Sequence, residues 1–238
     1  MDTEIRTIAA YCKKNLDLSH ATLSEEYFYN SLPCCVIDAV YSIGVTYTAT
    51  RNVVKRYCDY FNLRKIRADM TALPAIEAQE SITDFCNAYT NRGTSFFTDT
   101  VFMNRQRTST VRGILKAEAV YDFCRVLQNH GVNYFQDVPK ALSDATFESE
   151  IKMISGQKSG ISLKYFFMLA GSDDMVKPDR MIIRFLERTL ERRVGLEEAQ
   201  LFIQKTSEVL AQTYPSLNPR LLDHCVWNFQ RNITPTKS

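Results

Sequence analysis

The stretch Ile154–Leu186, ISGQKSGISLKYFFMLAGSDDMVKPDRMIIRFL, decides the fold of this chain. It begins with a turn that contains two glycines, continues as an apolar segment that stops at Gly171, and resumes after Asp179. After Asp179 the apolar residues recur at a spacing near 3.6, and arginines occupy many of the other positions. The stretch therefore predicts a glycine hairpin and two helices, at 159–170 and 180–193.

Helical spacing recurs through the rest of the chain, and no segment alternates strictly as a half-buried strand would. We therefore expect an all-α fold with two helical lobes. The expected helices are 3–16, 21–31, 33–42, 46–61, 74–90, 110–130, 146–154, 159–170, 180–193, 196–212 and 218–231. The polar segment 91–109 contains Arg92, Arg105 and Arg107, and we expect it to be a loop that connects the lobes.

The predicted organisation is a single unit across residues 1–238, a length that can bury a sizeable core. Lobe A spans approximately 30–105, and residues 1–29 pack on it or on its neighbour. Lobe B spans approximately 106–232 and contains the hairpin region 154–170. Residues 233–238 are expected to be a disordered tail.

Composition excludes several classes of protein. The chain is 45% hydrophobic and 24% charged with a net charge of +2, which is ordinary for a soluble globular protein. Its seven cysteines are scattered without a C-x-x-C pair, so we expect no disulfide framework, no metal site and no cofactor. The N-terminal segment lacks a signal-like apolar run, and no run is long enough to span a bilayer. We expect a cytoplasmic monomer without a membrane partner.

The hairpin Gly156–Gly160, GQKSG, has the properties of an anion site. Glycines in a tight turn let the backbone N–H groups at a helix start point outward, and these groups with the helix dipole favour an anion such as a DNA phosphate. Lys158 and Lys164 add positive charge nearby. The alternative is an ordinary connection, in which glycine ends one helix and serine caps the next.

Asp179 follows a proline and precedes a strongly amphipathic segment, which is typical of a helix N-cap. Capping alone would explain this residue. A carboxylate at a helix start can also act chemically, because the local N–H groups favour its charged form. Such an anion can stabilise positive charge that develops on a sugar and can orient a water molecule.

The pairing of this hairpin with this aspartate resembles the helix-hairpin-helix DNA glycosylase superfamily, HhH-GPD. The family pattern runs approximately L-P-G-V-G-x-K-T-A, then an apolar helix ending in glycine, then V-D-x-x-x-x-R. Here I-S-G-Q-K-S-G-I-S stands at 154–162, the apolar segment ends at Gly171, and K-P-D ends at Asp179. The family's catalytic aspartate falls on Asp179, its arginine on Arg184 and its first hairpin glycine on Gly156.

Other segments are similar to family elements in the same order. Residues 32–57 resemble a helix–loop–helix of the form A-V-x-L-S-Q-Q-T-x, with Ser42 and Thr46 at its serine and threonine. Residues 113–127 resemble the helix that often carries K-A, here beginning at Lys116. Residues 221–229 resemble the closing helix, so the resemblance covers roughly 30–60 and 110–232.

The resemblance implies an enzyme that flips a base out of double-stranded DNA and cleaves its N-glycosidic bond, with Asp179 as the catalytic carboxylate. The implied DNA-binding residues are Gly156, Gln157, Lys158, Ser159, Gly160 and Arg184. The implied base pocket and wedge are Tyr41, Ser42, Ile43, Gly44, Val45, Tyr47 and Trp227. An apolar wedge can insert between bases, and a tyrosine can stack on a flipped base. The alternative is that the tyrosines, and Trp227 with His224 one turn before it, pack in the core.

The sequence departs from the family pattern at the hairpin and at the wedge. Lys158 replaces the second hairpin glycine, and Gly160 stands where bifunctional members carry a Schiff-base lysine. Lysines displaced along a helix point elsewhere, so we predict a monofunctional enzyme that uses water and lacks strong AP-lyase activity.

The wedge segment, glutamine-rich in the family, is apolar here, which leaves the excised base open. It is either a damaged base, in repair, or a hypermodified base of phage DNA, in antiviral defence. Two other functions are compatible with the sequence: a non-catalytic DNA-binding module and an all-helical protein-interaction domain.

Overall fold

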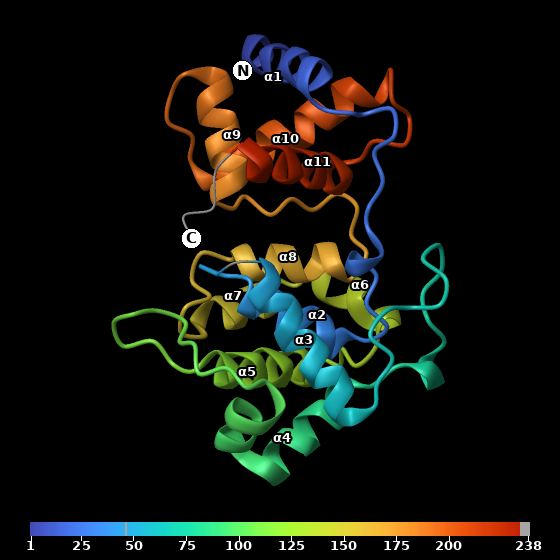
Figure 1. Cartoon of the computed structure of the whole chain (residues 1–238), viewed down its shortest axis with the longest axis vertical. Helices are drawn as coiled ribbons and strands as arrows, with labels where there is room; N and C mark the ends of the chain where they lie inside the picture. The colour runs from blue at the N-terminus through green and yellow to red at the C-terminus, as the bar shows by residue number, and fades with distance from the viewer. Residues whose placement is uncertain (46, 234–238) are drawn as a thin grey trace. The chain divides into compact units, whose positions relative to one another are not determined.

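The computed structural model describes residues 1–45 and 47–233, and within this range the protein is all-helical, as predicted. Its α-helices are α1 (Asp2–Asn15), α2 (Leu32–Tyr41), α3 (Tyr47–Phe61), α4 (Ile82–Phe96), α5 (Lys116–Asn129), α6 (Val138–Leu142), α7 (Ala145–Met153), α8 (Ile161–Leu169), α9 (Arg180–Leu190), α10 (Leu196–Ala211) and α11 (Pro219–Ile233) (Figure 1). Three 3-10 helices, η1 (Glu25–Tyr27), η2 (Ile76–Ala78) and η4 (Phe135–Asp137), and a π-helix, η3 (Phe97–Val101), complete the set. Thr46 and residues 234–238 of the predicted tail lie outside the described residues, and Ile233 ends α11.

The protein forms two compact units whose boundaries differ from those of the predicted lobes. Residues 1–24 and 171–233 make up one, here called the terminal unit, and Glu25–Ala170 make up the other, the central unit. The predicted boundary near residue 105 falls inside the central unit because α5 packs against both α4 and α2. The N-terminal helix belongs with the C-terminal helices because α1 packs on α9 and α10.

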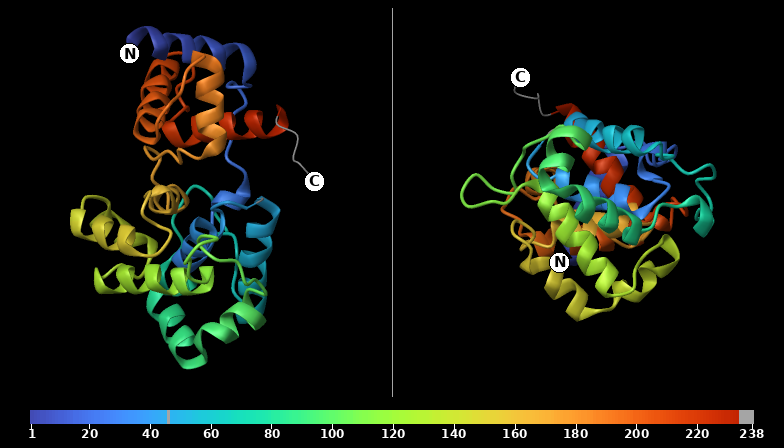
Figure 2. Two further views of the ribbon diagram at one scale, coloured as in Figure 1. Left: turned by 90° about the vertical axis from the view of Figure 1, so that its left-hand side faces the viewer. Right: turned by 90° about the horizontal axis from the view of Figure 1, so that it is seen from below.

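The core of the terminal unit lies between α1, α9, α10 and α11 (Figure 2). Phe185 of α9 is fully buried and meets Tyr11 of α1 edge-on, with ring centroids 5.4 Å apart. The ring of Phe229 in α11 also meets the Phe185 ring edge-on, with ring centroids 6.0 Å apart. Burial of apolar surface of this kind drives folding and fixes which face of α9 points inward.

Helix α2 lies at the centre of the central unit. All ten of its residues are buried, and it contacts α3, α5 and α8. Next to it is a cluster of aromatic rings with neighbouring centroids 4.6 to 6.1 Å apart: Tyr57, Phe85, Tyr89, Phe97 and Phe102. Rings at these distances add to the burial of their surface by favourable mutual geometry.

The expected loop at 91–109 is wrong over its first half. Helix α4 continues to Phe96 across a kink at Gly93, where φ is 79°, and the π-helix follows to Val101. Phe97 and Val101 are fully buried. Packing in the aromatic cluster therefore stabilises helical structure in residues 91–101, although their sequence is largely polar. The loop begins only after Val101.

The expected helix at 21–31 is also wrong, because backbone groups of this segment form hydrogen bonds with residues 65–67. The Asn30 N–H donates to the Lys65 carbonyl, and the Phe28 carbonyl accepts from the Arg67 N–H, each at 2.9 Å. Only η1 is helical in this segment.

Helix α4 starts later than expected, because Ser81 and Asp84 form a reciprocal capping box at its start. Helix α6 was not expected at all.

Candidate functional site

Asp179 caps the start of α9 in the terminal unit. Its Oδ1 accepts hydrogen bonds from the Met181 N–H at 2.7 Å and from the Ile182 N–H at 3.3 Å. The Asp179 N–H donates to the Lys177 carbonyl at 2.6 Å across Pro178, which bends the chain into the helix. The side chain is half-buried, and its Oδ2 has no hydrogen-bond partner among the described residues. One carboxylate oxygen therefore serves the helix, and the other remains available to a ligand.

A second carboxyl group supports this turn. Asp223 of α11 is buried, and its Oδ2 accepts from the Lys177 N–H at 3.0 Å. Burial raises the pKa of Asp223 well above its usual range, and the nearby Asp179 carboxylate raises it further. Both effects favour the neutral form of Asp223.

Asp223 was not among the residues predicted from the sequence, although its position carries a signal. It lies in α11 between the buried residues Leu222 and Val226, on a face that should be apolar. An acidic residue on such a face is seldom fully buried unless it is paired or neutral. An acidic residue on the apolar face of a helix is therefore by itself a reason to predict Asp223 as a site residue.

His224 and Trp227 lie on α11, as expected, and both contact their surroundings. The His224 Nε2 lies 2.9 Å from the Asn228 Nδ2, and burial lowers the pKa of His224, as do Arg220 and Arg231. Trp227 packs against the core of the terminal unit, and the Arg231 guanidinium lies 5.0 Å from its ring centroid. Trp227 is therefore partly buried against the core of the terminal unit and keeps part of its ring exposed.

The predicted hairpin is present in the central unit as two successive turns. The Gln157 N–H donates to the Ile154 carbonyl and the Gly160 N–H to the Gln157 carbonyl, both at 2.9 Å. Gly156 and Gly160 have φ of 86° and 70°, a region that favours glycine. Gly160 is the N-cap of α8, which therefore begins at Ile161 rather than at 159.

The five hairpin residues divide into interior and exposed members. Gln157 is 1% exposed, and its Oε1 accepts from the Ser162 hydroxyl, so it stabilises the hairpin from inside. Lys158 and Ser159 are exposed. Within the hairpin, these two residues offer side chains to a ligand.

A groove of about 800 Å³ runs beside the hairpin. Helix α7 and the turn that follows it line the groove, through residues that include Ser149, Lys152, Met153, Gly156 and Lys158. Lys152 pairs with Glu148 at 2.5 Å, whereas Lys158 has no ion pair among the residues that the structure describes. The groove thus combines backbone turns with a cationic side chain, a chemistry suited to a phosphate.

The loop after η3 lies against the hairpin. A Cβ atom added to Gly156 would sit 2.4 Å from the Thr108 Cβ, so only glycine permits this approach. The Thr108 N–H donates to the Ile114 carbonyl, and the Lys116 N–H donates to the Gln106 carbonyl, which closes residues 106–116 into a narrow loop (Figure 1).

The tip of this loop carries Val111, which is 75% exposed, and the exposed Arg112. The sequence predicted a helix over 110–130 here, but α5 begins only at Lys116, so Val111 and Arg112 lie in the loop.

Lys116 holds the turn predicted to be the wedge. Its Nζ donates to the carbonyls of Tyr41 and Ile43, at 3.0 and 2.7 Å, and the side chain is 2% exposed. Burial lowers the pKa of Lys116 to about 8. The turn comprises Ser42, Ile43, Gly44 and Val45, with Gly44 at a φ of 73°. A buried cation therefore fixes the backbone of the turn while Gly44 at its tip stays exposed.

The two tyrosines proposed to stack on a base lie in different environments. Tyr41 is 1% exposed and packs edge-on against Phe102 at 5.4 Å, so it is a core residue. Tyr47 is half-buried at the start of α3, and its hydroxyl donates to Glu26. Of the two, only Tyr47 is accessible in the central unit.

Comparison with known proteins gives a family but no characterised relative. Residues 6–231 match the model of a family described as Domain of unknown function (DUF8548). The chain belongs to this family. No curated protein and no solved structure was found to match it.

In the described residues of this DUF8548 chain, no three His, Cys, Asp or Glu side chains are placed to hold a metal ion together. In the same residues, no helix combines the length and apolar character needed to cross a membrane. The candidate site of the terminal unit is built on the carboxyl groups of Asp179 and Asp223, and that of the central unit on backbone turns with Lys158.

Proposed function

We propose that this protein is a monofunctional DNA glycosylase of the HhH-GPD type, which flips a damaged or modified base out of double-stranded DNA and excises it with water. The geometry of Asp179 carries this proposal. Its Oδ1 is committed to the start of α9, and its Oδ2 has no partner among the described residues. A carboxylate held in this way is oriented before any substrate binds, which is what electrostatic stabilisation of a transition state requires.

The reaction breaks the bond between C1′ of the deoxyribose and the base nitrogen. The electron pair leaves with the base, and positive charge develops on the sugar. Asp179 would stabilise this charge and orient a water molecule, whose oxygen bonds to C1′; the proton that the water loses to solvent balances the proton that the departing base nitrogen takes up. The products are a free base and an abasic site, and the use of a carboxylate parallels other glycosidic cleavages.

Asp223 would act as a positioning residue in this scheme. It holds the Lys177 N–H, and the Lys177 carbonyl holds the Asp179 N–H. This chain of contacts sets the angle at which Asp179 enters α9. Correct placement of a reacting group contributes strongly to rate.

Two features of the central unit support hydrolysis rather than lyase chemistry, and DNA rather than another polymer. Gly160 occupies the helix N-cap where bifunctional members carry a nucleophilic lysine. The hairpin groove and the Val111–Arg112 loop tip offer, respectively, a phosphate contact and an insertion point.

The substrate class that we favour is a modified base outside the repair repertoire, such as a hypermodified base of phage DNA. The wedge turn is apolar and pinned by Lys116, unlike the glutamine-rich family loop. A screen of genomic DNAs, modified and unmodified, with mass detection of released bases tests this choice. Release from ordinary DNA but not from phage DNA would contradict it.

A non-catalytic DNA-binding module is the second candidate, because the exposed Lys158 and the groove need no carboxylate to hold DNA. It predicts DNA binding without an abasic product on any DNA.

Asp179→Asn separates the two candidates. Asparagine caps a helix about as well as aspartate, whereas alanine loses about 1 kcal/mol. We expect Asp179→Asn to keep the stability and DNA affinity of the protein and to abolish base release, as measured by mass spectrometry. Asp179→Ala serves as the control for capping. Full base release by the asparagine variant would refute the catalytic role of Asp179.

A further inference from the structure

Helix α9 carries three arginines in a row on its exposed face: Arg180, Arg184 and Arg188. Residues four apart in an α-helix are about 6 Å apart along the axis and about 40° apart around it. The three side chains therefore form a continuous row about 12 Å long. We call this row the arginine ridge. The opposite face of α9 buries Ile182, Phe185 and Leu186, so packing of the terminal unit holds the ridge outward.

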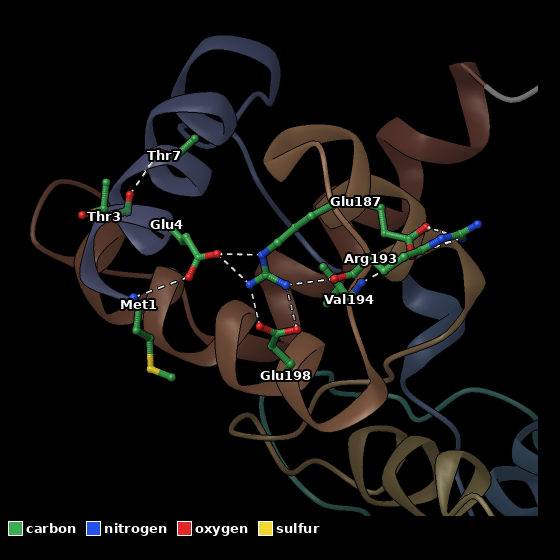
Figure 3. Close-up of polar contacts among 9 residues, drawn as sticks. Met1, Thr3, Glu4, Thr7, Glu187, Arg193, Val194 and Glu198 are labelled. Atoms are coloured by element: carbon green, nitrogen blue, oxygen red, sulfur yellow. Dashed lines mark hydrogen bonds and ion pairs between the residues drawn. The ribbon is translucent and has the colours of Figure 1, made fainter.

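Four other basic residues of the terminal unit, unlike those of the ridge, are paired with carboxylates: Arg192, Arg193, Lys205 and Arg220. Arg192 binds Glu4 and Glu198, each at 2.6 Å, and Lys205 binds Glu208 at 2.8 Å. Figure 3 shows Glu4 and Glu198 turned toward one guanidinium, and Arg193 beside Glu187. The ridge arginines have no ion pair and no side-chain hydrogen bond among the residues that the structure describes.

Neighbouring carboxylates do not neutralise the ridge. Glu187 follows Arg184 by three residues, but it accepts from the Val194 N–H and pairs with Arg193. Glu191 ends the helix in a left-handed conformation. Like charges four residues apart destabilise a helix, and a cation in the first turn opposes the helix dipole. Arg180 and the like charges thus weaken the start of α9, whereas Arg188 in its last turn complements the helix dipole, and the cost at the start favours a role in binding a partner.

We propose that the arginine ridge binds the sugar–phosphate backbone of one DNA strand. A guanidinium presents two parallel N–H donors that match the oxygens of a phosphate. One strand of a duplex carries a phosphate about every 3.4 Å along the axis, so a row of about 12 Å faces three to four phosphates. Contacts of this kind position a protein on DNA without reading its sequence. The inference takes DNA as the polyanion from the proposed function and extends the contact from Arg184 to the whole face of α9.

Salt dependence of DNA binding tests the ridge directly. Each phosphate contact contributes about 0.9 to the slope of log affinity against log salt. We expect the triple variant R180Q/R184Q/R188Q to lower that slope by about 2.7 and to weaken binding at 0.15 M salt on the order of 100-fold. The probe is a fluorescent 20-base-pair duplex of mixed sequence, measured by anisotropy between 0.05 and 0.3 M KCl.

A matched variant controls for the loss of three charges. R6Q/K13Q/K14Q removes the same charge from the terminal unit at exposed positions of α1, outside the ridge, and it should change affinity less than threefold. The lysine variant R180K/R184K/R188K should keep the slope, since it keeps the charge. Circular dichroism checks that all variants remain helical.

Three outcomes overturn the inference. Equal losses in the ridge and control variants would reveal a response to net charge alone. An unchanged slope in R180Q/R184Q/R188Q would place the phosphate contacts elsewhere. Equal affinity of the ridge for poly-glutamate and for duplex would assign it to an acidic protein. Because binding is measured without base release, a protein that binds DNA through the ridge and releases no base contradicts only the proposed function.

Discussion

Replacing Gly156 with alanine tests the close approach between the hairpin and the loop after η3. Two effects oppose the new methyl group. The backbone φ of 86° is costly for alanine by about 1–2 kcal/mol. The new Cβ would also lie 2.4 Å from the Thr108 Cβ, far inside the usual carbon–carbon separation of about 3.5–4.0 Å.

The contact cannot be relieved by a side-chain rotation. The Thr108 Cβ is bonded directly to its backbone, so the loop or the hairpin must move. Overpacking of this kind costs about 1–3 kcal/mol, which gives a total loss of about 2–5 kcal/mol for Gly156→Ala.

Gly131→Ala is the matched control in the same unit. Gly131 has a φ of 68°, but an added Cβ there would meet no atom within 4 Å. It should therefore lose only the backbone contribution, about 1–2 kcal/mol. The difference between the two variants isolates the contact with Thr108.

The assay is urea unfolding of each variant, combined with a double-mutant cycle. Thr108→Gly removes the opposing Cβ and should recover about 1–3 kcal/mol in the Gly156→Ala background. Equal destabilisation of the Gly156 and Gly131 variants, or no recovery with Thr108→Gly, would refute the reasoning.

Two further predictions concern buried ionisable groups. Burial raises the pKa of Glu80 from 4.5 to about 7, although the Tyr57 hydroxyl donates to it at 2.6 Å. The folded state then holds this proton more tightly than the unfolded state, so Glu80 should remove about 3 kcal/mol of stability as pH rises from 4.5 to 8. Glu80→Gln should flatten that part of the stability curve measured by urea unfolding, and an identical curve would contradict this account. Lys116→Met removes two charged hydrogen bonds to the wedge turn, so it should lower the free energy of unfolding by about 3 kcal/mol. It should also speed hydrogen exchange of the Ser42 and Gly44 amides. Unchanged exchange at these amides would mean that Lys116 does not hold the turn.

The sequence determined the parts of the fold that depend on near neighbours. Asp179 and the apolar period after it specify the start of α9, because capping and amphipathic burial act within a few residues. The glycines of the hairpin specify its turns for the same reason, since positive φ is a property of single residues.

Segments whose structure depends on distant partners were predicted poorly. Residues 21–31 read as helical but pair with the backbone near Lys65 and Arg67. Phe97 and Val101 lie in a stretch that reads as a loop, yet the aromatic cluster buries both. Burial and long-range hydrogen bonding overrode local preference in each case.

The residues of the candidate site also divide into those set by near neighbours and those set by distant partners. Asp179 and Gly156 could be named from sequence patterns, because each does its local work in one turn of chain. Asp223 is 44 residues from Asp179 (223 − 179), and Thr108 is 48 residues from Gly156 (156 − 108). Only the tertiary structure brings these partners together, because packing of helices, rather than residue spacing, sets which distant side chains meet.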